Sequence, residues 1–456
     1  MSFLSELPSQ RIIVIGAGVT GEALLTFLKT RGVEEITLLD EKAKQLSGAR
    51  LISELDHVNF DVAIVSPGWK RTHPAIQALS AAGVSIMGEI DFAWKVKLEL
   101  APHQKWIALT GTNGKTTTVQ MVESIFAAAD INGIACGNVG RTVIEAVMNN
   151  DPYDLLAIEL SSFQIEWSAL ASFESAAILN IADDHIDWHG SFDNYAQTKI
   201  SLLNRAQIGI LNLGDPEVVL RASSWNGKKV FFGLDTPAEN EIGLVENLLT
   251  DRAFSADARN AEVIAELADI NPAVPHNVMN AMAAAGLALS VGISHDRVQK
   301  GLAEFAPDHH RLELVLESNG ISWVDDSKAT NPHAALAALG SYLSVIWIAG
   351  GLAKGARMDA LVQRAGARVK AAILIGEDRD LIAQALKDSA PHIPYFLIDK
   401  QSSSEKLMDD VVAKAKELAE SGDTVLLAPA CASMDQFASY AQRGDFFAAS
   451  VRRAQS

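Results

Sequence analysis

Short apolar runs rich in β-branched residues recur along the whole chain, separated by longer segments rich in alanine and leucine. Strands buried on both faces of a parallel sheet give such apolar runs, and the crossover helices between them give the longer segments. The alternation therefore predicts an α/β fold built on parallel sheets. We expect strands at residues 12–15, 36–39, 62–65, 107–109, 155–158, 177–179, 345–348, 372–375 and 425–427.

Two polar stretches interrupt this pattern, one containing Pro102 and the other Pro307. Domain boundaries commonly fall in segments of this composition. We therefore predict three α/β domains, which cover residues 1–102, 103–306 and 307–456. The first and the third are expected to be Rossmann-like, and the second a P-loop-type domain. Residues 212–255 show no clear period, and no elements are predicted there.

A glycine-rich turn, G-A-G-V-T-G at residues 16–21, follows the first predicted strand and precedes a helical pattern. Asp40 ends the next strand, about 20 residues further on, as in a dinucleotide-binding βαβ unit. In such a unit the backbone N–H groups at a helix N-terminus hold a diphosphate. The first domain is therefore expected to bind a diphosphate, and a glycine turn without a ligand is the alternative. A second turn, S-P-G at residues 66–68, is expected to line the same crevice unless it is a plain β-turn.

A second candidate phosphate loop, T-G-T-N-G-K-T-T-T at residues 110–118, lies between a predicted strand and a helix that extends to about residue 129. Its glycines let backbone amides wrap a phosphate, Lys115 can reach the β- and γ-phosphates, and the Thr116 hydroxyl can bind Mg²⁺. The common P-loop has glycine where this chain has Leu109, so the loop is a shortened variant. Two phosphate loops suit a chain that binds both ATP and a nucleotide-linked substrate.

Two further residues follow strands and are candidate metal ligands. Glu159 ends an apolar strand after the phosphate loop, where an acidic residue would share Mg²⁺ with Thr116. His185 lies in N-I-A-D-D-H-I-D-W-H-G, residues 180–190, after the strand at 177–179. A single histidine is most often structural, but one beside a phosphate loop can bind a second cation.

Composition and charge narrow the classes of protein that are possible. The 456 residues have a formal net charge of −18, a surface field that argues against nucleic acid and anionic membrane as partners. Cys136 and Cys431 fit no zinc or redox spacing, which favours buried thiols in a reducing compartment. The N-terminal segment does not resemble a secretion signal, and no apolar run has the roughly 18 residues that a membrane span needs. We expect a cytoplasmic protein.

Several blocks of this sequence resemble the Mur ligase family, in family order and across all three predicted domains. They are GTNGKTT at 111–117, IELSSFQ at 158–164, NIADDHIDWHG at 180–190, HNVMNAMAA at 276–284, HRLE at 310–313, DDSKATNP at 325–332 and PACASMDQF at 429–437. Together with the glycine-rich first domain, they are most similar to the D-glutamate-adding members.

The resemblance implies an activity and its partners. The chain is expected to be a monomeric, ATP-dependent amide ligase that joins D-glutamate to UDP-N-acetylmuramoyl-L-alanine through an acyl phosphate, in peptidoglycan precursor synthesis. ATP and two Mg²⁺ ions are the expected cofactors. Residues 1–102 would bind the UDP-linked substrate, residues 103–306 ATP, and residues 307–456 D-glutamate.

The resemblance also implies roles for individual residues. The catalytic residues would be Lys115, Glu159, His185 and Lys199. The metal ligands would be Thr116, Glu159, His185 and Lys199, the last as a carbamate; without the resemblance, Lys199 is interpreted as a solvated helix lysine. ATP would contact Gly111, Thr112, Asn113, Gly114, Lys115, Thr116, Thr117, Asn277, Asn280, Arg311 and Asp326. The UDP-linked substrate would contact Gly18, Val19, Thr20, Asp40, Ser66, Gly68, Asn138, Ser161 and Gln164. D-Glutamate would contact Thr330, Lys354, Ser433, Met434 and Tyr440.

Three alternatives remain open from the sequence. A sister ligase, such as a folylpolyglutamate synthase or another Mur enzyme, would share the ATP chemistry and differ in the substrate domains. An NAD-dependent dehydrogenase would use the first glycine turn but leave the loop at 111–118 and Glu159 without a role. A non-catalytic ATP-binding switch would release no phosphate with any acceptor.

Overall fold

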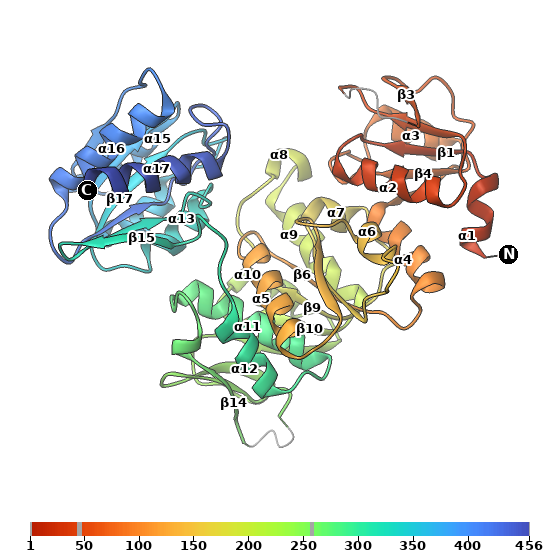
Figure 1. The fold of residues 1–456 in the computed structure, drawn as a ribbon, viewed down its shortest axis with the longest axis horizontal. Helices are drawn as coiled ribbons and strands as arrows, with labels where there is room; N and C mark the ends of the chain where they lie inside the picture. The colour runs from red at the N-terminus through yellow and green to blue at the C-terminus, as the bar shows by residue number, and fades with distance from the viewer. Residues whose placement is uncertain (1, 43–47, 256–259, 456) are drawn as a thin grey trace. The chain divides into compact units, whose positions relative to one another are not determined.

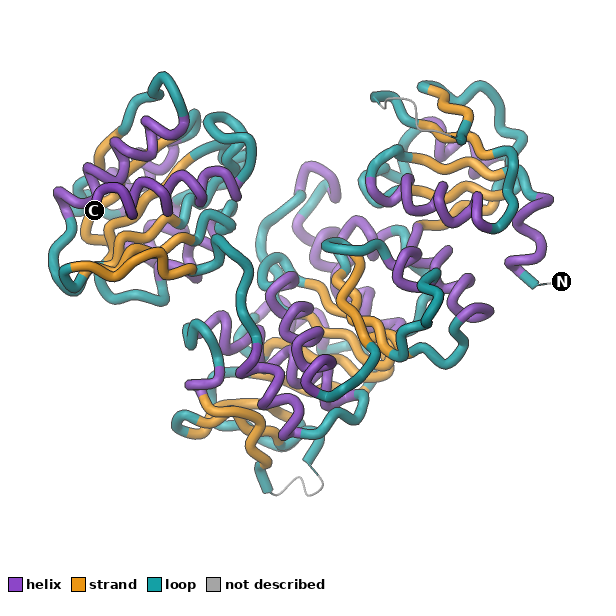
Figure 2. The backbone as a smooth tube through the Cα atoms, viewed as in Figure 1, coloured by secondary structure: helices purple, strands orange, loops and turns teal. Residues whose placement is uncertain are grey.

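The computed structural model describes residues 2–42, 48–255 and 260–455. Its strands form three sheets of five, nine and six strands, and helices flank the sheets (Figures 1 and 2). The chain divides into two compact units, residues 1–305 with the first two sheets and residues 306–456 with the third. The fold is thus α/β with mainly parallel sheets, as predicted, while the division into three domains stays a prediction. Within the described ranges, no helix is both long and apolar enough to span a bilayer.

The first sheet is parallel throughout and has the strand order of a dinucleotide-binding domain. Strands predicted at 12–15, 36–39 and 62–65 have those bounds in the structure. The order is β3 (Arg50–Ile52), β2 (Ile36–Leu39), β1 (Ile12–Ile15), β4 (Val62–Val65) and β5 (Ser85–Gly88). Its helices are α1 (Phe3–Glu6), α2 (Val19–Thr30), α3 (Pro74–Ala81) and α4 (Glu89–Leu100).

The second sheet is parallel except at one edge. Its strand order is β14 (Glu262–Glu266), β13 (Leu248–Asp251), β12 (Glu241–Val245), β11 (Lys228–Phe232), β10 (Ala206–Asn212), β9 (Phe173–Ile178), β6 (Lys105–Thr110), β8 (Leu155–Glu159) and β7 (Gly133–Gly137). Strands β12, β13 and β14 pair antiparallel. Strand β9 starts at Phe173, before the predicted 177. The prediction missed its first residues because Glu174 and Ser175 interrupt the apolar run.

Short and long helices flank this sheet. Helix α5 (Lys115–Ala128) follows β6, and α11 (Pro275–Ser290) and α12 (His295–Glu304) pack against α5. The shorter helices follow other strands and are α6 (Val143–Val147), α7 (Ser162–Glu166), α8 (Ile186–His189), α9 (Phe192–Ile200) and α10 (Pro216–Ala222). The loops at the carboxyl ends of β6, β8 and β9 therefore lead into α5, α7 and α8 and form one edge of the sheet.

The third sheet corrects one expectation. It has the order β15 (Glu313–Ser318), β16 (Ile321–Asp325), β20 (Thr424–Leu427), β17 (Val345–Gly350), β18 (Val369–Ile375) and β19 (Tyr395–Leu397), and β15 is antiparallel to β16. The last strand is inserted between β16 and β17, so the strand order is not that of a Rossmann domain. The pattern of apolar runs gives the order of strands along the chain and not their order in the sheet, so it cannot reveal this insertion. The helices are α13 (Pro332–Leu339), α14 (Asp359–Ala365), α15 (Arg379–Ser389), α16 (Ser404–Leu418) and α17 (Tyr440–Gln455).

One hydrophobic core is shared by the first two sheets. Its buried side chains include Leu24 of α2, Phe92 of α4, Val143 of α6 and Leu156 of β8. The rings of Trp94 and Trp106 lie edge to face at 5.0 Å and join α4 to β6. The first sheet and the central sheet are therefore packed through α4 and α6.

Two buried carboxylates of α4 also join these two parts. Glu89 accepts a 2.6 Å hydrogen bond from the backbone N–H of Ile144, and burial raises the pKa of Glu89 to about 7. Asp91 accepts bonds of 2.7, 2.9 and 3.2 Å from the N–H groups of Ala169, Leu170 and Ala171. Because these donors belong to the loop after α7, Asp91 fixes that loop to α4.

Asp91→Ala is expected to lower the free energy of unfolding by about 2–4 kcal/mol, because three backbone donors lose a charged acceptor. Asp91→Asn keeps one acceptor oxygen, so its free energy of unfolding is expected to fall by less than that of Asp91→Ala. Chemical denaturation followed by tryptophan fluorescence measures both. Asp193→Ala is the control, since the Asp193 carboxylate is exposed and its ion pair with Arg221 is worth about 1 kcal/mol or less. Equal losses in Asp91→Ala and Asp193→Ala would refute the role of Asp91.

Candidate active site

The loop between β6 and α5 is held by side chains from the end of β9. Asn180 accepts a 2.8 Å hydrogen bond from the N–H of Asn113 and donates one of 3.0 Å to its carbonyl oxygen. Thr112 donates its N–H to the Asn180 carbonyl at 3.0 Å, and its hydroxyl lies 2.9 Å from the Tyr195 hydroxyl. The predicted phosphate loop is thus a fixed turn.

Gly114 precedes α5 and has a φ of +84°, in the left-handed region. A Cβ atom at this position would lie 2.4 Å from Oδ1 of Asn280. The left-handed conformation therefore favours glycine, and an added Cβ would displace the Asn280 side chain. Thr116 and Thr117 follow in the first turn of α5, where the N-terminal N–H groups of a helix attract anions.

Two lysine side chains meet at the carbonyl oxygen of Gly111. The Lys115 ammonium donates to this oxygen at 2.9 Å and to the Thr112 carbonyl at 3.0 Å. The Lys199 ammonium donates to the same oxygen at 2.8 Å and to the Thr110 hydroxyl at 3.3 Å. Two lysine side chains therefore converge on one carbonyl oxygen of the loop.

Lys199 is buried, which corrects its interpretation as a solvated helix lysine. Only 2% of its surface is exposed, and its ammonium lies 4.8 Å from the centre of the Tyr195 ring. Burial first, and then the charge of Lys115, hold the pKa of Lys199 well below its usual value. A neutral amine is the form that reacts with an electrophile such as CO₂.

Glu159 lies beside this loop because β8 pairs with β6, with Glu159 opposite Leu109. Its carboxylate is buried, and Oε1 accepts a 2.9 Å hydrogen bond from the Asn138 side chain. Oε2 is also buried but receives no hydrogen bond from the described residues. A buried carboxylate oxygen without a donor is costly unless it binds a cation, so Glu159 fits the predicted role of a Mg²⁺ ligand.

His185 begins α8 in a left-handed conformation, with φ of 52°, and about half of its side chain is exposed. Its Nε2 atom lies 3.4 Å from Asp184. His189, which the sequence did not single out, lies one turn later, with Nε2 2.9 Å from the Ser162 hydroxyl. Burial, and then the charges of His185 and Lys199, lower the pKa of His189 to about 4. The His189 side chain therefore lies close enough to His185 and Lys199 to feel the charge of each.

Ser161 and Gln164, two predicted substrate-binding residues, form hydrogen bonds with each other. The Ser161 hydroxyl accepts a hydrogen bond from the N–H of Gln164 at 3.2 Å, and Gln164 Oε1 accepts one from the N–H of Ser161 at 2.9 Å. This is a capping box, whose S-x-x-Q pattern the sequence already contains. Ser161 and Gln164 therefore begin α7 as a rigid unit, next to Glu159 at the end of β8.

The glycine turn of the first sheet is equally ordered. Gly16 has a φ of +98°, and Asp40 accepts hydrogen bonds from the N–H groups of Ala17 at 2.8 Å and Lys42 at 2.9 Å. Ser66 donates its hydroxyl to the Gly16 carbonyl at 3.3 Å. Asp40 and Ser66 thus shape the turn.

Four other predicted residues lie around this turn. Gly18 is the N-cap of α2, and Val19 and Thr20 form its first turn. The Val19 side chain is 69% exposed. The Gly68 carbonyl accepts a 3.2 Å hydrogen bond from the Trp188 indole. The turn is therefore open to a ligand on its α2 side.

The two asparagines of α11 differ in their surroundings. Asn280 lies beside Gly114, as described, whereas the Asn277 side chain donates to the carbonyl oxygens of Asn271 and Pro272 at 3.2 and 3.0 Å. Asn280 is thus adjacent to the phosphate loop, and Asn277 stabilises the chain that enters α11.

In the second unit, Arg311 and Asp326 lie near each other, and burial raises the pKa of Asp326 to about 7. Asp326 accepts the N–H of Leu312 at 3.3 Å. His310, adjacent to Arg311, lies with Nδ1 2.7 Å from Asp325. The start of this unit is therefore tied to the end of β16.

Of the residues predicted for D-glutamate, Thr330, Lys354, Ser433 and Met434 lie on loops that follow strands of the third sheet, and Tyr440 is the first residue of α17. Ser433 is buried and Met434 is 72% exposed, Thr330 and Tyr440 are half-buried, and Lys354 is exposed with φ of 50°. Leu352 and Ala432 form a backbone bridge, so the loops carrying Lys354 and Ser433 are adjacent. The Lys328 ammonium lies 3.8 Å from the centre of the Tyr440 ring.

Arg443 organises these loops and was not predicted. Its fully buried guanidinium donates to the carbonyl oxygens of Ser327 at 2.9 Å, Cys431 at 3.2 Å and Gly350 at 3.4 Å. Burial lowers the pKa of Arg443 to about 10. An arginine within the apolar face of the last helix was the available sequence signal.

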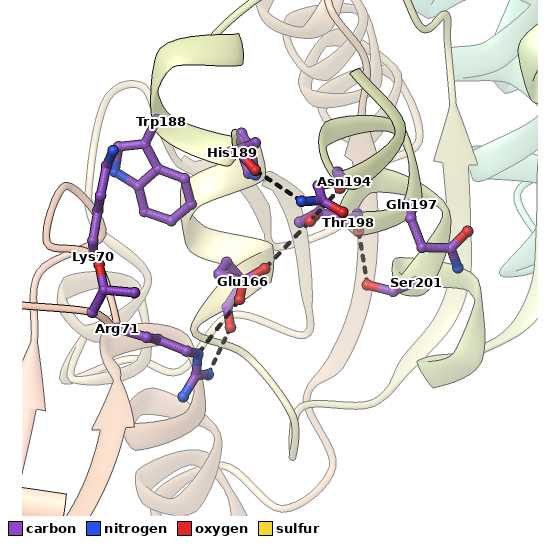
Figure 3. Close-up of a pocket in the computed structure, with 10 residues that line it drawn as sticks. Lys70, Arg71, Glu166, Trp188, His189, Asn194, Gln197, Thr198 and Ser201 are labelled. Carbon is purple, nitrogen blue, oxygen red and sulfur yellow. Dashed lines mark hydrogen bonds and ion pairs between the residues drawn. The ribbon is translucent and has the colours of Figure 1, made fainter. Parts of the chain in front are cut away.

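A pocket of about 470 Å³ lies where the loop after β4 meets helices α7, α8 and α9 (Figure 3). It is lined by Lys70, Arg71, Thr72, Glu166, Trp188, His189, Asn194, Gln197, Thr198 and Ser201. None of these is a predicted substrate contact, so the pocket is adjacent to the candidate site rather than part of it. The two cysteines, Cys136 and Cys431, are buried and unbonded, as expected.

Gly114→Ala is expected to weaken MgATP binding at least about tenfold, because the left-handed conformation and the contact with Asn280 together cost more than about 1.4 kcal/mol. Isothermal titration calorimetry measures the affinity. Gly292→Ala is the matched control, since Gly292 also has a positive φ, of +89°, but a Cβ there meets nothing within 4 Å. Unchanged affinity in Gly114→Ala would show that this turn does not bind the nucleotide.

Comparison with known proteins agrees with the architecture of the site. Residues 109–288 match the Mur ligase middle domain, and residues 310–431 match the Mur ligase glutamate ligase domain. The UDP-N-acetylmuramoylalanine–D-glutamate ligase of Thermobifida fusca (strain YX) is 43% identical over 466 residues, covering 98% of this chain and 99% of the relative. The enzyme of that name from Streptomyces coelicolor is 42% identical over 468 residues, with 98% and 99% covered.

Solved structures show the same fold at low identity. MurF of Acinetobacter baumannii has a TM-score of 0.61 at 15% identity, with 99% of this chain and 98% of that chain covered. The MurF ligase of Thermotoga maritima, solved in complex with ADP, has a TM-score of 0.61 at 14% identity, with 98% and 99% covered. The relatives from Thermobifida fusca and Streptomyces coelicolor, at 43% and 42% identity, match along almost the whole chain. The chain therefore belongs to the Mur ligase family.

Proposed function

We propose that this chain is an ATP-dependent amide ligase that adds D-glutamate to UDP-N-acetylmuramoyl-L-alanine in peptidoglycan precursor synthesis. The observation that carries the proposal is the convergence of Lys115 and Lys199 on the Gly111 carbonyl, beside the buried carboxylate of Glu159. The charge of Lys115, a buried lysine that can be carbamylated and a carboxylate oxygen without a donor among the described residues suit phosphoryl transfer at a phosphate loop. In such reactions, positioning and charge stabilisation provide most of the catalysis. The names of the full-length relatives supply the substrates.

The reaction would begin with attack of the L-alanyl carboxylate on the γ-phosphate of ATP, giving an acyl phosphate and ADP. Lys115 would neutralise charge on the phosphate oxygens. Magnesium, when bound, lowers the charge of the phosphates, and Thr116, Glu159, His185 and a carbamylated Lys199 would hold two such ions. The amine of D-glutamate would then attack the acyl carbon, and phosphate would leave as the amide forms. No protein nucleophile is needed.

Carbamylation would convert Lys199 from a cation into an anion. An ammonium at this position would repel metal ions beside the γ-phosphate, whereas a carbamate offers two oxygen ligands. The burial of Lys199 supports this part of the proposal, since burial favours the neutral amine that reacts with CO₂. Tyr195 and the Thr110 hydroxyl would then surround the carbamate.

The remaining candidates are assigned by the family resemblance. Asn277, Asn280, Arg311 and Asp326 would contact the nucleotide, and the turn at residues 16–21 the uridine diphosphate. Thr330, Lys354, Ser433, Met434 and Tyr440 would bind D-glutamate. The proposal includes a monomer in the cytoplasm, and three domains that bind the UDP-linked substrate, ATP and D-glutamate in order along the chain.

Phosphate release from ATP should require Mg²⁺, UDP-N-acetylmuramoyl-L-alanine and D-glutamate together. L-Alanine and meso-diaminopimelate should not replace D-glutamate, which separates this function from those of sister ligases. Lys115→Ala should reduce release by at least about a thousandfold, since one charge on the transferring phosphate is worth several kcal/mol. Lys300→Ala, an exposed lysine of α12, is the control. Activity with another acceptor, or saturable binding of NADH by fluorescence, would contradict the proposal.

Lys199→Ala should lose activity and recover part of it when a short carboxylic acid such as formate is added, because the acid would replace the carbamate oxygens in the vacated space. Lys115→Ala should not be rescued by the same acid. Steady-state phosphate release measures both variants, and circular dichroism confirms that they are folded. A folded Lys199→Ala that formate does not rescue would refute the carbamate.

A further inference from the structure

Four hydrogen bonds hold the loop after β4 against two short helices of the central sheet. The Trp188 indole donates to the Gly68 carbonyl at 3.2 Å, and the Lys70 ammonium donates to the Asp187 carbonyl at 3.0 Å. These two bonds engage α8. We call the residues 68–71 with their four bonds the loop clamp.

The other two bonds of the loop clamp engage α7 and its C-cap. The Trp167 indole donates to the Trp69 carbonyl at 2.8 Å, and the Arg71 guanidinium donates to the Glu166 carbonyl at 2.7 Å. Arg71 also lies 4.2 Å from the centre of the Trp167 ring. Figure 3 shows Arg71 directed at Glu166 and Trp188 beside Lys70. Each helix is therefore bound to the loop through one indole and one cationic side chain.

The two helices held by the loop clamp are very short, so the clamp lies close to the candidate site residues at their N-terminal ends. Helix α7 has five residues and α8 has four, so each is little more than one turn. The Ser161–Gln164 capping box begins α7, and His185 begins α8. Both helices thus present candidate site residues at one end and hold the loop at the other.

The turn that the loop clamp holds is itself a candidate site. Ser66 and Gly68 precede the clamp residues directly, and Ser66 is bonded to the Gly16 carbonyl of the glycine turn. A shift of the loop relative to α8 would therefore change the distance between this turn and His185. Helix α8 has only four residues, so it is too short to absorb a displacement of Trp188 by bending, and the displacement would reach His185.

We propose that Trp188 is a positioning residue that sets the Ser66–Gly68 turn relative to His185, and so shapes the binding site of the UDP-linked substrate. The inference rests on the proposed function and assigns Trp188, Trp167, Lys70 and Arg71 a role outside the set of ligand-contacting residues. The phosphate loop is held separately, by Asn180 and Tyr195. Loss of the clamp should therefore affect the UDP-linked substrate and not ATP.

The test replaces Trp188 by phenylalanine, which removes the indole N–H but keeps a ring against Phe163, whose centroid lies 4.8 Å away. Amide hydrogen exchange of residues 66–73 in the ligand-free protein should become faster. KM for UDP-N-acetylmuramoyl-L-alanine should rise about three- to tenfold, the equivalent of one hydrogen bond. KM for ATP and kcat should stay within about twofold, as expected when only ground-state positioning of one substrate is lost.

Trp167→Phe should act in the same direction through the α7 side of the clamp. Trp225→Phe is the matched control, because the Trp225 ring packs against Gly209 and Gly227, away from the clamp. Faster exchange with unchanged KM in Trp188→Phe would reduce the clamp to a purely structural contact and overturn the proposal. Unchanged exchange, or a loss confined to kcat, would overturn it as well.

The proposed function and the clamp fail in different ways. If the wild-type chain neither binds UDP-N-acetylmuramoyl-L-alanine by calorimetry nor releases phosphate with it, the proposed function fails and the positioning role fails with it. If the wild-type chain is active and Trp188→Phe matches Trp225→Phe in every constant, only the positioning role is refuted.

Discussion

The carbonyl oxygen of Gly111 accepts hydrogen bonds from two lysine ammonium groups, and much of the central sheet serves to make that possible. Burial, and the charge of Lys115 beside it, disfavour the charged form of Lys199. Carbamylation of Lys199 would replace one of the two positive charges by a negative one, and phosphate oxygens would neutralise the charge of Lys115. Asn180, Thr112 and Tyr195 keep the loop rigid meanwhile, so the site is built for ligands that supply negative charge.

The sequence predicted this edge of the sheet well because its signals are local. The strands of the first sheet, the glycine turn and the phosphate loop each depend on a few adjacent residues. Lys199 was misjudged without the family resemblance because helix α9 is short, although Tyr195, Ala196 and Ile200 mark one buried face on which Lys199 also lies. The pairing of Ser161 with Gln164 was equally visible as a capping pattern.

Other features depend on contacts between distant residues and could not be predicted. The insertion of β20 between β16 and β17, and the antiparallel edge formed by β13 and β14, are properties of topology rather than of local pattern. Arg443 falls in the same class. Its place on the apolar face of α17 was visible in the sequence. The carbonyl groups of Ser327, Gly350 and Cys431, to which its guanidinium donates, meet only in the folded chain.

The shared core of α2, α4, α6 and β8 bears on how this chain can be dissected. A fragment that ends near residue 102 would leave Leu24 and Phe92 without the apolar partners that cover them. The exposed hydrophobic surface would favour self-association. Cutting after residue 305 leaves that core intact. Anyone wishing to express residues 1–102 should therefore keep the central sheet with them, because residues 1–305 form one compact unit.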